Sequence, residues 1–197
     1  MKVKITLNVE MLGTACQNKE VHEEYIASKS KDAEKVKEEL GALPSEELME
    51  KAVTVFPRDN DGTPFLYDYQ FKGFIKESFR IILELADGIT VGKAKLSKWT
   101  CDKMVDNHVD VFPRKIKLVP TGAICTRPLR AKTPKGERIS LASSETIPAG
   151  SEFEVEIVTD HPVLDEMVVK ALNRGMKKGL GQWRNSGKGR FTWEEVK

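Results

Sequence analysis

The residues best suited to chemistry lie in one stretch near the carboxyl end of the 197-residue chain. Between Arg174 and Arg190 the sequence holds six basic residues and no acidic one. Glycines occupy positions 175, 179, 181, 187 and 189 of this stretch. Because glycine lets a backbone come close to a partner, its amide N–H groups and the neighbouring cations can hold an anion together. This combination favours a polyanionic backbone as the partner.

The same stretch contains Trp183, whose ring offers a stacking face worth about 1 to 3 kcal/mol per nucleic-acid base. We therefore predict nucleic-acid contacts from the side chains of Lys177, Lys178, Trp183, Arg184, Lys188 and Arg190, and from the loop backbone at Gly179, Gly181, Gly187 and Gly189. The alternative is a flexible loop whose Trp183 is packed in the core. The Walker pattern G-x-x-x-x-G-K-[ST] is absent, and the segment does not follow a strand as GxGxxG requires, so we expect no nucleotide cofactor.

A second basic cluster spans residues 113–138, with eight basic residues and one acidic residue. Residues 1–62 carry a net charge of −4, which leaves +6 on the rest of the chain. From the cluster we add Arg114, Arg127 and Arg130 to the predicted contacts. We also predict contacts from Lys72, Lys76 and Arg80, which recur every fourth residue along one edge of a predicted helix. The alternative is that they form a basic edge exposed to solvent.

No pattern of residues indicates catalysis or a metal site. His22, His108 and His161 have no motif around them, although a histidine can act as a general base. The segment 59–62 begins like a calcium loop but lacks its later ligands, so an Asx turn is favoured. The cysteines at 16, 101 and 125 are too far apart for a CxxC ligand pair. We predict no catalytic residue and no metal ligand.

The composition is that of a soluble globular protein, with 40% apolar residues, 31% charged residues and a mean hydropathy of −0.40. No stretch approaches the roughly 18 uncharged apolar residues of a membrane span, and the amino terminus alternates instead of forming a signal-peptide block. We expect a cytoplasmic protein with no membrane partner.

Periodicity predicts the elements that must position these residues. Alternation predicts strands near 3–11, 109–118, 153–157 and 189–196, and a helical period predicts helices over 70–86 and 162–172. This order of strand, helix, strand, strand, helix, strand is the ferredoxin-like, RRM-like βαββαβ arrangement of the α+β class. We predict a single domain, 1–197, with a helical insert at 14–62, a basic hairpin insert at 119–148 and a glycine-rich loop at 175–190.

The segment GLGQWRNSGKGRF, from Gly179 to Phe191, resembles the glycine-rich loop of the CRISPR RAMP superfamily. Lys72-Gly73 followed by Lys76 is similar to that family's P-G-S-S-x-K-G-x-x-R segment beside bound RNA. Residues 66–70 replace the proline-glycine-serine part, and Lys76 stands where arginine is usual. The chain also resembles proteins carried by bacteriophages and prophages. The resemblance implies a RAMP-like domain that binds RNA as crRNA-binding backbone subunits do.

The leading hypothesis is a non-catalytic, phage-borne protein that holds single-stranded RNA along its sheet and glycine-rich loop. It would act in antiviral defence, without a cofactor, as a homo-oligomer or a filament along RNA. One alternative is a protein-binding mimic or inhibitor of a host CRISPR or other defence complex. A metal-independent endoribonuclease is the second alternative, so whether the protein is an enzyme stays open.

Overall fold

The computed structural model describes residues 1–16, 54–86, 89–120, 122–133 and 136–196. For residues 16 and 129–141 it describes the backbone only, within those ranges. Its central sheet has four antiparallel strands in the order β13-β1-β12-β8. The strands are β1 (Lys2–Leu7), β8 (Val109–Phe112), β12 (Glu152–Thr159) and β13 (Phe191–Val196). This order and the intervening helices confirm the predicted ferredoxin-like fold.

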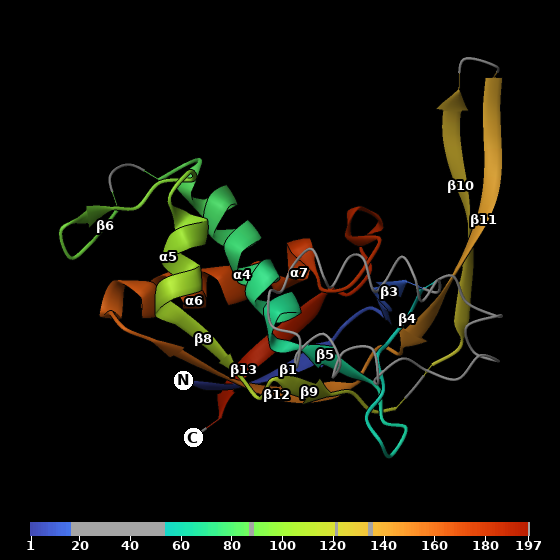
Figure 1. Cartoon of the computed structure of the whole chain (residues 1–197), viewed down its shortest axis with the longest axis horizontal. Helices are drawn as coiled ribbons and strands as arrows, with labels where there is room; N and C mark the ends of the chain where they lie inside the picture. Colours follow the sequence, from blue (N-terminus) through green and yellow to red (C-terminus); the bar gives the residue numbers. More distant parts are fainter. Residues whose placement is uncertain (17–53, 87–88, 121, 134–135, 197) are drawn as a thin grey trace.

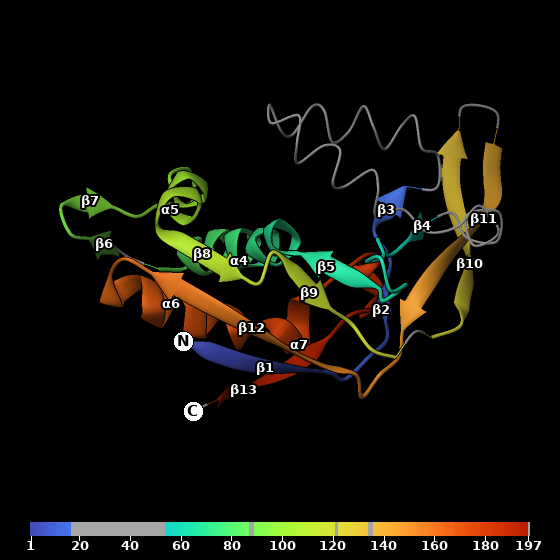
Figure 2. The ribbon, with the colours of Figure 1, turned by 60° about the horizontal axis from the view of Figure 1, so that its bottom comes forward.

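Alternating strand residues build the core on one face of this sheet. Val3, Ile5 and Leu7 of β1 are buried, and Ile5 lies opposite Phe153 of β12. Helices α4 (Asp68–Leu83) and α6 (Pro162–Leu172) cover that face, as Figure 2 shows. The opposite face carries the polar residues of the same strands.

Aromatic packing joins the first helix to the last strand. Phe71 and Phe74 of α4 are buried, and the Phe74 ring centroid lies 5.2 Å from that of Phe191. At the start of α6, the Nδ1 of His161 accepts a hydrogen bond of 3.2 Å from the N–H of Val163, so this histidine is a helix cap. No helix in the described part of the chain is long and apolar enough to cross a membrane.

The predicted strand at 109–118 is two strands with different partners. β8 joins the central sheet, whereas β9 (Lys115–Lys117) pairs with β5 (Phe65–Tyr67), the strand that leads into α4. Pro113 lies between them, as its missing N–H would predict. The helix α5 (Cys101–His108) and the small hairpin of β6 (Thr90–Val91) and β7 (Ala94–Lys95) are additions that periodicity did not predict.

A second sheet contains the basic hairpin, formed by β10 (Ile124–Thr133) and β11 (Gly136–Ile147). Figure 1 shows this hairpin projecting away from the central sheet. Short strands pair at its base: β2 (Met11–Leu12), β3 (Ala15–Cys16) and β4 (Thr54–Val55). Of the predicted helical insert 14–62, residues 17–53 and with them His22 lie outside the described residues.

Candidate nucleic-acid interface

The glycine-rich loop follows α6 through the short helix α7 (Gly175–Lys178) and the 3₁₀ turn η1 (Arg184–Ser186), and it packs tightly on the body of the protein. A Cβ at Gly189 would lie 1.9 Å from the carbonyl oxygen of Leu180, and one at Gly181 would lie 2.5 Å from that of Leu12. Both glycines have a positive φ. Their lack of a side chain is therefore required by backbone packing.

Three of the four glycine amides that we expected to face phosphate donate inside the protein. The N–H of Gly189 donates to the carbonyl oxygen of Glu10 at 2.8 Å. The N–H of Gly179 donates to Gly175, and that of Gly187 donates to Arg184, at 3.1 and 2.9 Å. Direct contacts from these amides to an RNA backbone would require those bonds to open, so the arrangement does not support the predicted backbone role.

Three cations of the loop face carboxylates of the protein itself. Lys178 lies 2.7 Å from Glu77 of α4, Arg184 donates to the same carboxylate, and Lys188 pairs with Glu10. Burial alone raises the pKa of Glu77, but the hydrogen bonds from Lys178 and Arg184 outweigh that effect, so its pKa lies below the ordinary value. Two cations against one carboxylate leave a net positive charge at this point.

Lys177 and Arg190 are exposed, and neither forms an ion pair with a carboxylate in the described part of the chain. They are the loop cations that remain available to an external anion. Their contact with RNA stays a prediction, as do the contacts of Lys178, Arg184 and Lys188.

Trp183 lies against the hairpin instead of filling the core. The guanidinium carbon of Arg127 lies 4.7 Å from its ring centroid, and Arg127 donates to the hydroxyl of Ser144 at 2.8 Å. Arg127 is only 7% exposed, so this predicted RNA contact is a buried residue that joins the hairpin to the loop. Trp183 as a residue is half-buried.

The basic edge of α4 forms an ion-pair ladder with the neighbouring α5–β8 segment. Every fourth residue of α4 meets an acidic residue there, which explains the spacing noted in the sequence. The pairs are Lys72 with Asp110 at 3.4 Å, Lys76 with Asp106 at 2.5 Å, and Arg80 Nε with Asp102 Oδ1 at 2.8 Å. The three predicted RNA contacts Lys72, Lys76 and Arg80 are therefore engaged in holding α5 against α4.

Arg114 lies at the start of α4, 3.6 Å from the carboxylate of Asp68, with its guanidinium carbon 5.1 Å from the ring centroid of Tyr67. This position is next to the cleft described below. The side chain of Arg130 lies outside the described residues, and its predicted contact stays a prediction.

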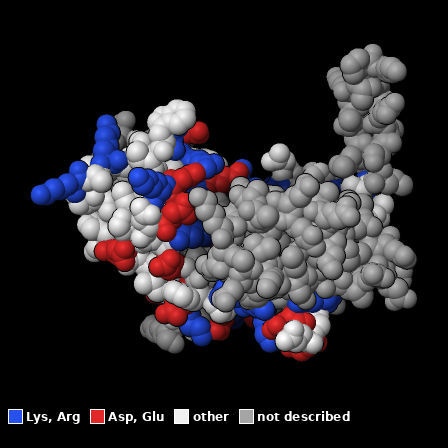
Figure 3. All heavy atoms as spheres, viewed as in Figure 1, with Lys and Arg blue, Asp and Glu red and all other residues white. Residues whose placement is uncertain are grey.

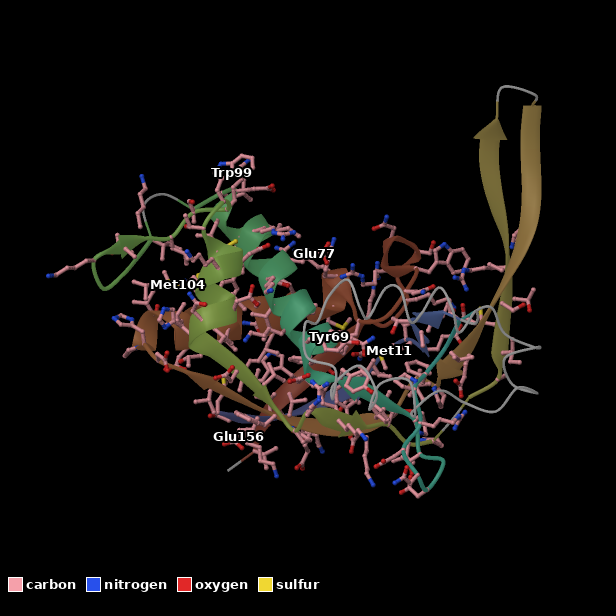
Figure 4. All side chains as sticks on the ribbon, in the orientation of Figure 1. Met11, Tyr69, Glu77, Trp99, Met104 and Glu156 are labelled. Atoms are coloured by element: carbon pink, nitrogen blue, oxygen red, sulfur yellow. The ribbon has the colours of Figure 1, made fainter. Side chains whose placement is uncertain are left out.

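A cleft of about 500 Å³ separates the first turns of α4 from the glycine-rich loop. Both predicted segments line it, together with residues that sequence reasoning did not select. The lining includes Thr14, Pro57, Tyr67, Tyr69, Gln70, Gly73, Phe74, Glu77, Leu180, Gly181 and Arg184. Figure 4 labels Tyr69 and Glu77 along α4. The aromatic-rich segment 66–70 is the sequence feature that could have predicted this site. In the sequence it stood out only as a departure from the RAMP segment.

Stacked rings and one amide give the cleft its polar and aromatic character. The rings of Tyr67 and Tyr69 are stacked with centroids 5.3 Å apart, and Tyr69 is 41% exposed. The Gln70 side chain accepts from the N–H of Tyr67 at 3.0 Å and donates to the hydroxyl of Thr14 at 2.5 Å. At Gly73 a Cβ would meet no atom within 4 Å, so this helical glycine opens toward space.

The sheet face that the helices leave uncovered is acidic. Four glutamates on it face two lysines; they are Glu152, Glu154, Glu156 and Glu194, with Lys2 and Lys4. Lys2 lies 2.5 Å from Glu154, and Lys4 lies 2.7 Å from Glu194. Because this face carries a net negative charge, it does not support the expectation that RNA lies along the sheet.

Neither described histidine lies beside the glycine-rich loop, where we considered a general base. His108 Nδ1 is 2.9 Å from Asp160, and His161 caps α6 at the end opposite the glycine-rich loop. Within the described ranges no group of three or more His, Cys, Asp or Glu side chains could hold a metal ion.

No protein-family model and no curated protein matches this sequence. Among solved structures, the chain is similar to a chain of the cryo-EM structure of the Type III-B Cmr-beta bound to cognate target RNA. The TM-score is 0.58 at 10% sequence identity, covering 100% of this chain and 58% of that chain. The protein thus spans little more than half the length of its structural neighbour. The likeness concerns the fold, which agrees with the RAMP-like fold that the sequence resemblance implied.

Proposed function

We propose that this protein binds single-stranded RNA, without cleaving it, in the cleft between α4 and the glycine-rich loop. The observation that carries the proposal is this cleft, placed where two RAMP-like segments meet in a fold similar to a chain solved with target RNA. Phage origin, a role in antiviral defence and a homo-oligomer along RNA stay predictions that accompany it.

The chemistry of the cleft supports a nucleic-acid base inside and a phosphate backbone outside. Aromatic rings, an amide and a bare helical backbone at Gly73 suit a flat ring with hydrogen-bonding edges. At the rim, Lys178 and Arg184 outnumber the carboxylate of Glu77. Lys177, which precedes Lys178 in the same short helix, is exposed. Cations around an aromatic pocket are the arrangement found in single-strand binding sites.

Gly73 allows a direct test of this placement. Gly73→Phe directs a ring into open space, whereas the matched Gly73→Ala adds only a methyl group and favours the helix. Each variant is titrated with a labelled 15-nucleotide oligouridylate and with a base-free ribose phosphate of equal length, using fluorescence anisotropy. We expect the parent and Gly73→Ala to bind the base-bearing RNA about tenfold more tightly than the base-free chain, a difference of about 1.4 kcal/mol.

In Gly73→Phe that preference for base-bearing RNA should disappear, while the affinity for the base-free chain stays unchanged. Circular dichroism confirms that both variants keep their helices. If the parent binds both chains equally, or if the Phe and Ala variants bind alike, the cleft does not hold a base. Absence of any salt-sensitive RNA binding by the parent would reject the proposed function itself.

The acidic sheet face favours a second candidate, a protein-binding mimic or inhibitor of a defence complex. A cationic protein surface fits the glutamates of β12 better than RNA does. The charge-reversed variant Glu154→Lys with Glu156→Lys tests this idea in a pull-down from host lysate treated with RNase. Recovery of subunits of a defence complex by the parent but not by the variant would support mimicry. Equal recovery by both proteins would reject it.

The endoribonuclease alternative has no supporting geometry at His108 or His161. Incubation of labelled RNA with the protein in EDTA, and separately with each histidine changed to alanine, tests it. Cleavage that a His→Ala change abolishes would replace the non-catalytic proposal.

A further inference from the structure

Four lysines stand apart from the ion pairing found elsewhere in the molecule. They lie in the β6–β7 hairpin, in its connection to α5 and in the first turn of α5, and they are Lys93, Lys95, Lys98 and Lys103. All four are exposed, and no carboxylate in the described part of the chain pairs with them. Figure 3 shows basic side chains extending from the end of the molecule that carries this hairpin. We name these residues, with Trp99, the lysine–tryptophan patch.

Trp99 is the second feature of this patch. It is 84% exposed, and the Nζ of Lys98 lies 5.0 Å from its ring centroid. Burying a tryptophan ring is strongly favourable, and Trp99 is left exposed to water. An exposed aromatic surface of this size suggests a ligand that covers it. Figure 4 shows Trp99 on the outside of the molecule, away from the core.

The loop that carries Trp99 is fixed on both sides. Leu96 is only 2% exposed and anchors the loop in the core. The N–H of Ser97 donates to the hydroxyl of Thr100 at 3.0 Å, which closes the turn around the tryptophan. The ring is thus presented outward by a turn with its own hydrogen bonds, which lowers the ordering cost of binding through it.

Local charge strengthens the case for an anionic ligand. The nearest carboxylate in sequence, Asp102, receives a bidentate pair of hydrogen bonds from Arg80. Its charge is therefore matched by a cation outside the patch, and the lysines are left to an external partner. Exposed cations around an exposed aromatic ring match the two needs of a single strand, which are charge neutralisation and base stacking.

We propose that the lysine–tryptophan patch is a second contact for the RNA bound in the cleft, with a base stacked on Trp99 and phosphates held by the lysines. This inference rests on the proposed function, because it names a further part of the same strand's path. The patch follows the end of α4, whereas the cleft lies at its start. A helix of 16 residues spans about 24 Å, so a long strand reaches both sites and a trinucleotide does not.

The test compares a 15-nucleotide and a 3-nucleotide oligouridylate on the full chain. One variant is Trp99→Ala. Another is Lys95→Ala with Lys98→Ala, and its matched control, Lys2→Ala with Lys170→Ala, removes the same charge from other exposed positions. Fluorescence anisotropy gives the affinity at several salt concentrations, and thermal unfolding verifies that every variant is folded.

We expect Trp99→Ala to weaken binding of the 15-mer about tenfold and to leave the 3-mer unchanged. The double lysine variant should lower the salt slope of the 15-mer by about 1.4, at about 0.7 for each lost phosphate contact, and the control should not. If the parent binds the 15-mer and both patch variants match it, the patch inference is overturned while RNA binding by the protein stands.

If the parent binds neither oligonucleotide, the proposed function fails and takes the patch inference with it. A last measurement tests binding of the parent and the patch variants to vesicles of phosphatidylserine and phosphatidylcholine, because tryptophan and lysine also suit an anionic lipid surface. Vesicle binding that the patch variants lose, together with unchanged RNA binding, would assign the patch to lipid and overturn the inference.

Discussion

Replacement of Gly189 by alanine tests whether the glycine-rich loop is built for packing. The new Cβ would overlap the carbonyl oxygen of Leu180 at 1.9 Å, and the φ of +68° disfavours any side chain. The left-handed backbone costs about 1 to 2 kcal/mol and overpacking about 1 to 3 kcal/mol. The neighbouring carbonyl groups cannot easily retreat, because Leu180 donates to Gly189 and Gly189 to Glu10, both at 2.8 Å. We therefore expect a loss of about 3 kcal/mol.

The same substitution at Gly73 should act in the opposite direction. Gly73 is in the second turn of α4, inside the helix, and a Cβ there meets no atom within 4 Å. Alanine is about 1 kcal/mol better than glycine in a helix interior. For a protein of this size 1 kcal/mol shifts Tm by roughly 2 to 4 °C, so Gly189→Ala should lower Tm by about 6 to 12 °C and Gly73→Ala should raise it slightly.

Differential scanning calorimetry without RNA measures both variants against the parent. The reasoning fails if Gly189→Ala melts within about 2 °C of the parent. In that case Leu180 and its neighbours adapt to the new methyl group, and the glycines would be free for another role, such as contact with a phosphate.

Three further predictions follow from the charges and the buried thiol. The pKa of Glu77 is lower in the folded protein than its ordinary value of 4.5, so its contribution to stability is present above that value and is lost as pH falls below it. Urea unfolding at pH 7 and about pH 3.5 should therefore show a smaller loss of stability on acidification in Glu77→Gln than in the parent. Burial is the main cause that raises the pKa of Cys101, and the nearby carboxylate of Asp102 adds to it. After iodoacetamide treatment at about pH 8, mass spectrometry should find Cys125 modified and Cys101 protected, and equal modification of both would contradict this. A double-mutant cycle on Arg80 and Asp102 should give a coupling of about 0.5 kcal/mol that shrinks in 1 M salt, and a salt-independent value would be evidence against the ion pair.

The frame of the fold could be predicted because its signals are local. The alternation of Val3, Ile5 and Leu7 and the period of α4 depend only on neighbouring residues. The structure buries these strand residues and the first part of the predicted helical face, whereas Leu85 near the predicted end is 91% exposed. Helix α5 was missed because it has eight residues, of which only Cys101 and Val105 are buried. Such a short, polar helix gives too weak a period to be recognised.

The candidate site could be predicted only in part, because its charges are decided by distant partners. Lys188 meets Glu10, which is 178 positions away, and Arg184 meets Glu77 at a separation of 107. A single sequence cannot show such pairings, so a cluster of cations in the chain is not a cluster of free cations in space. The lysines around Trp99 are fewer and less conspicuous in the sequence, yet no carboxylate among the described residues forms an ion pair with them.

The glutamates of the uncovered sheet face limit the directions from which a polyanion could approach the protein. Its four glutamates outnumber its two lysines, Lys2 and Lys4, which leaves a net charge of −2 among these six side chains. An anionic strand that approached this face would be repelled, so it would meet the molecule on another side. This repulsion would be strongest at low ionic strength and would act before any specific contact has formed.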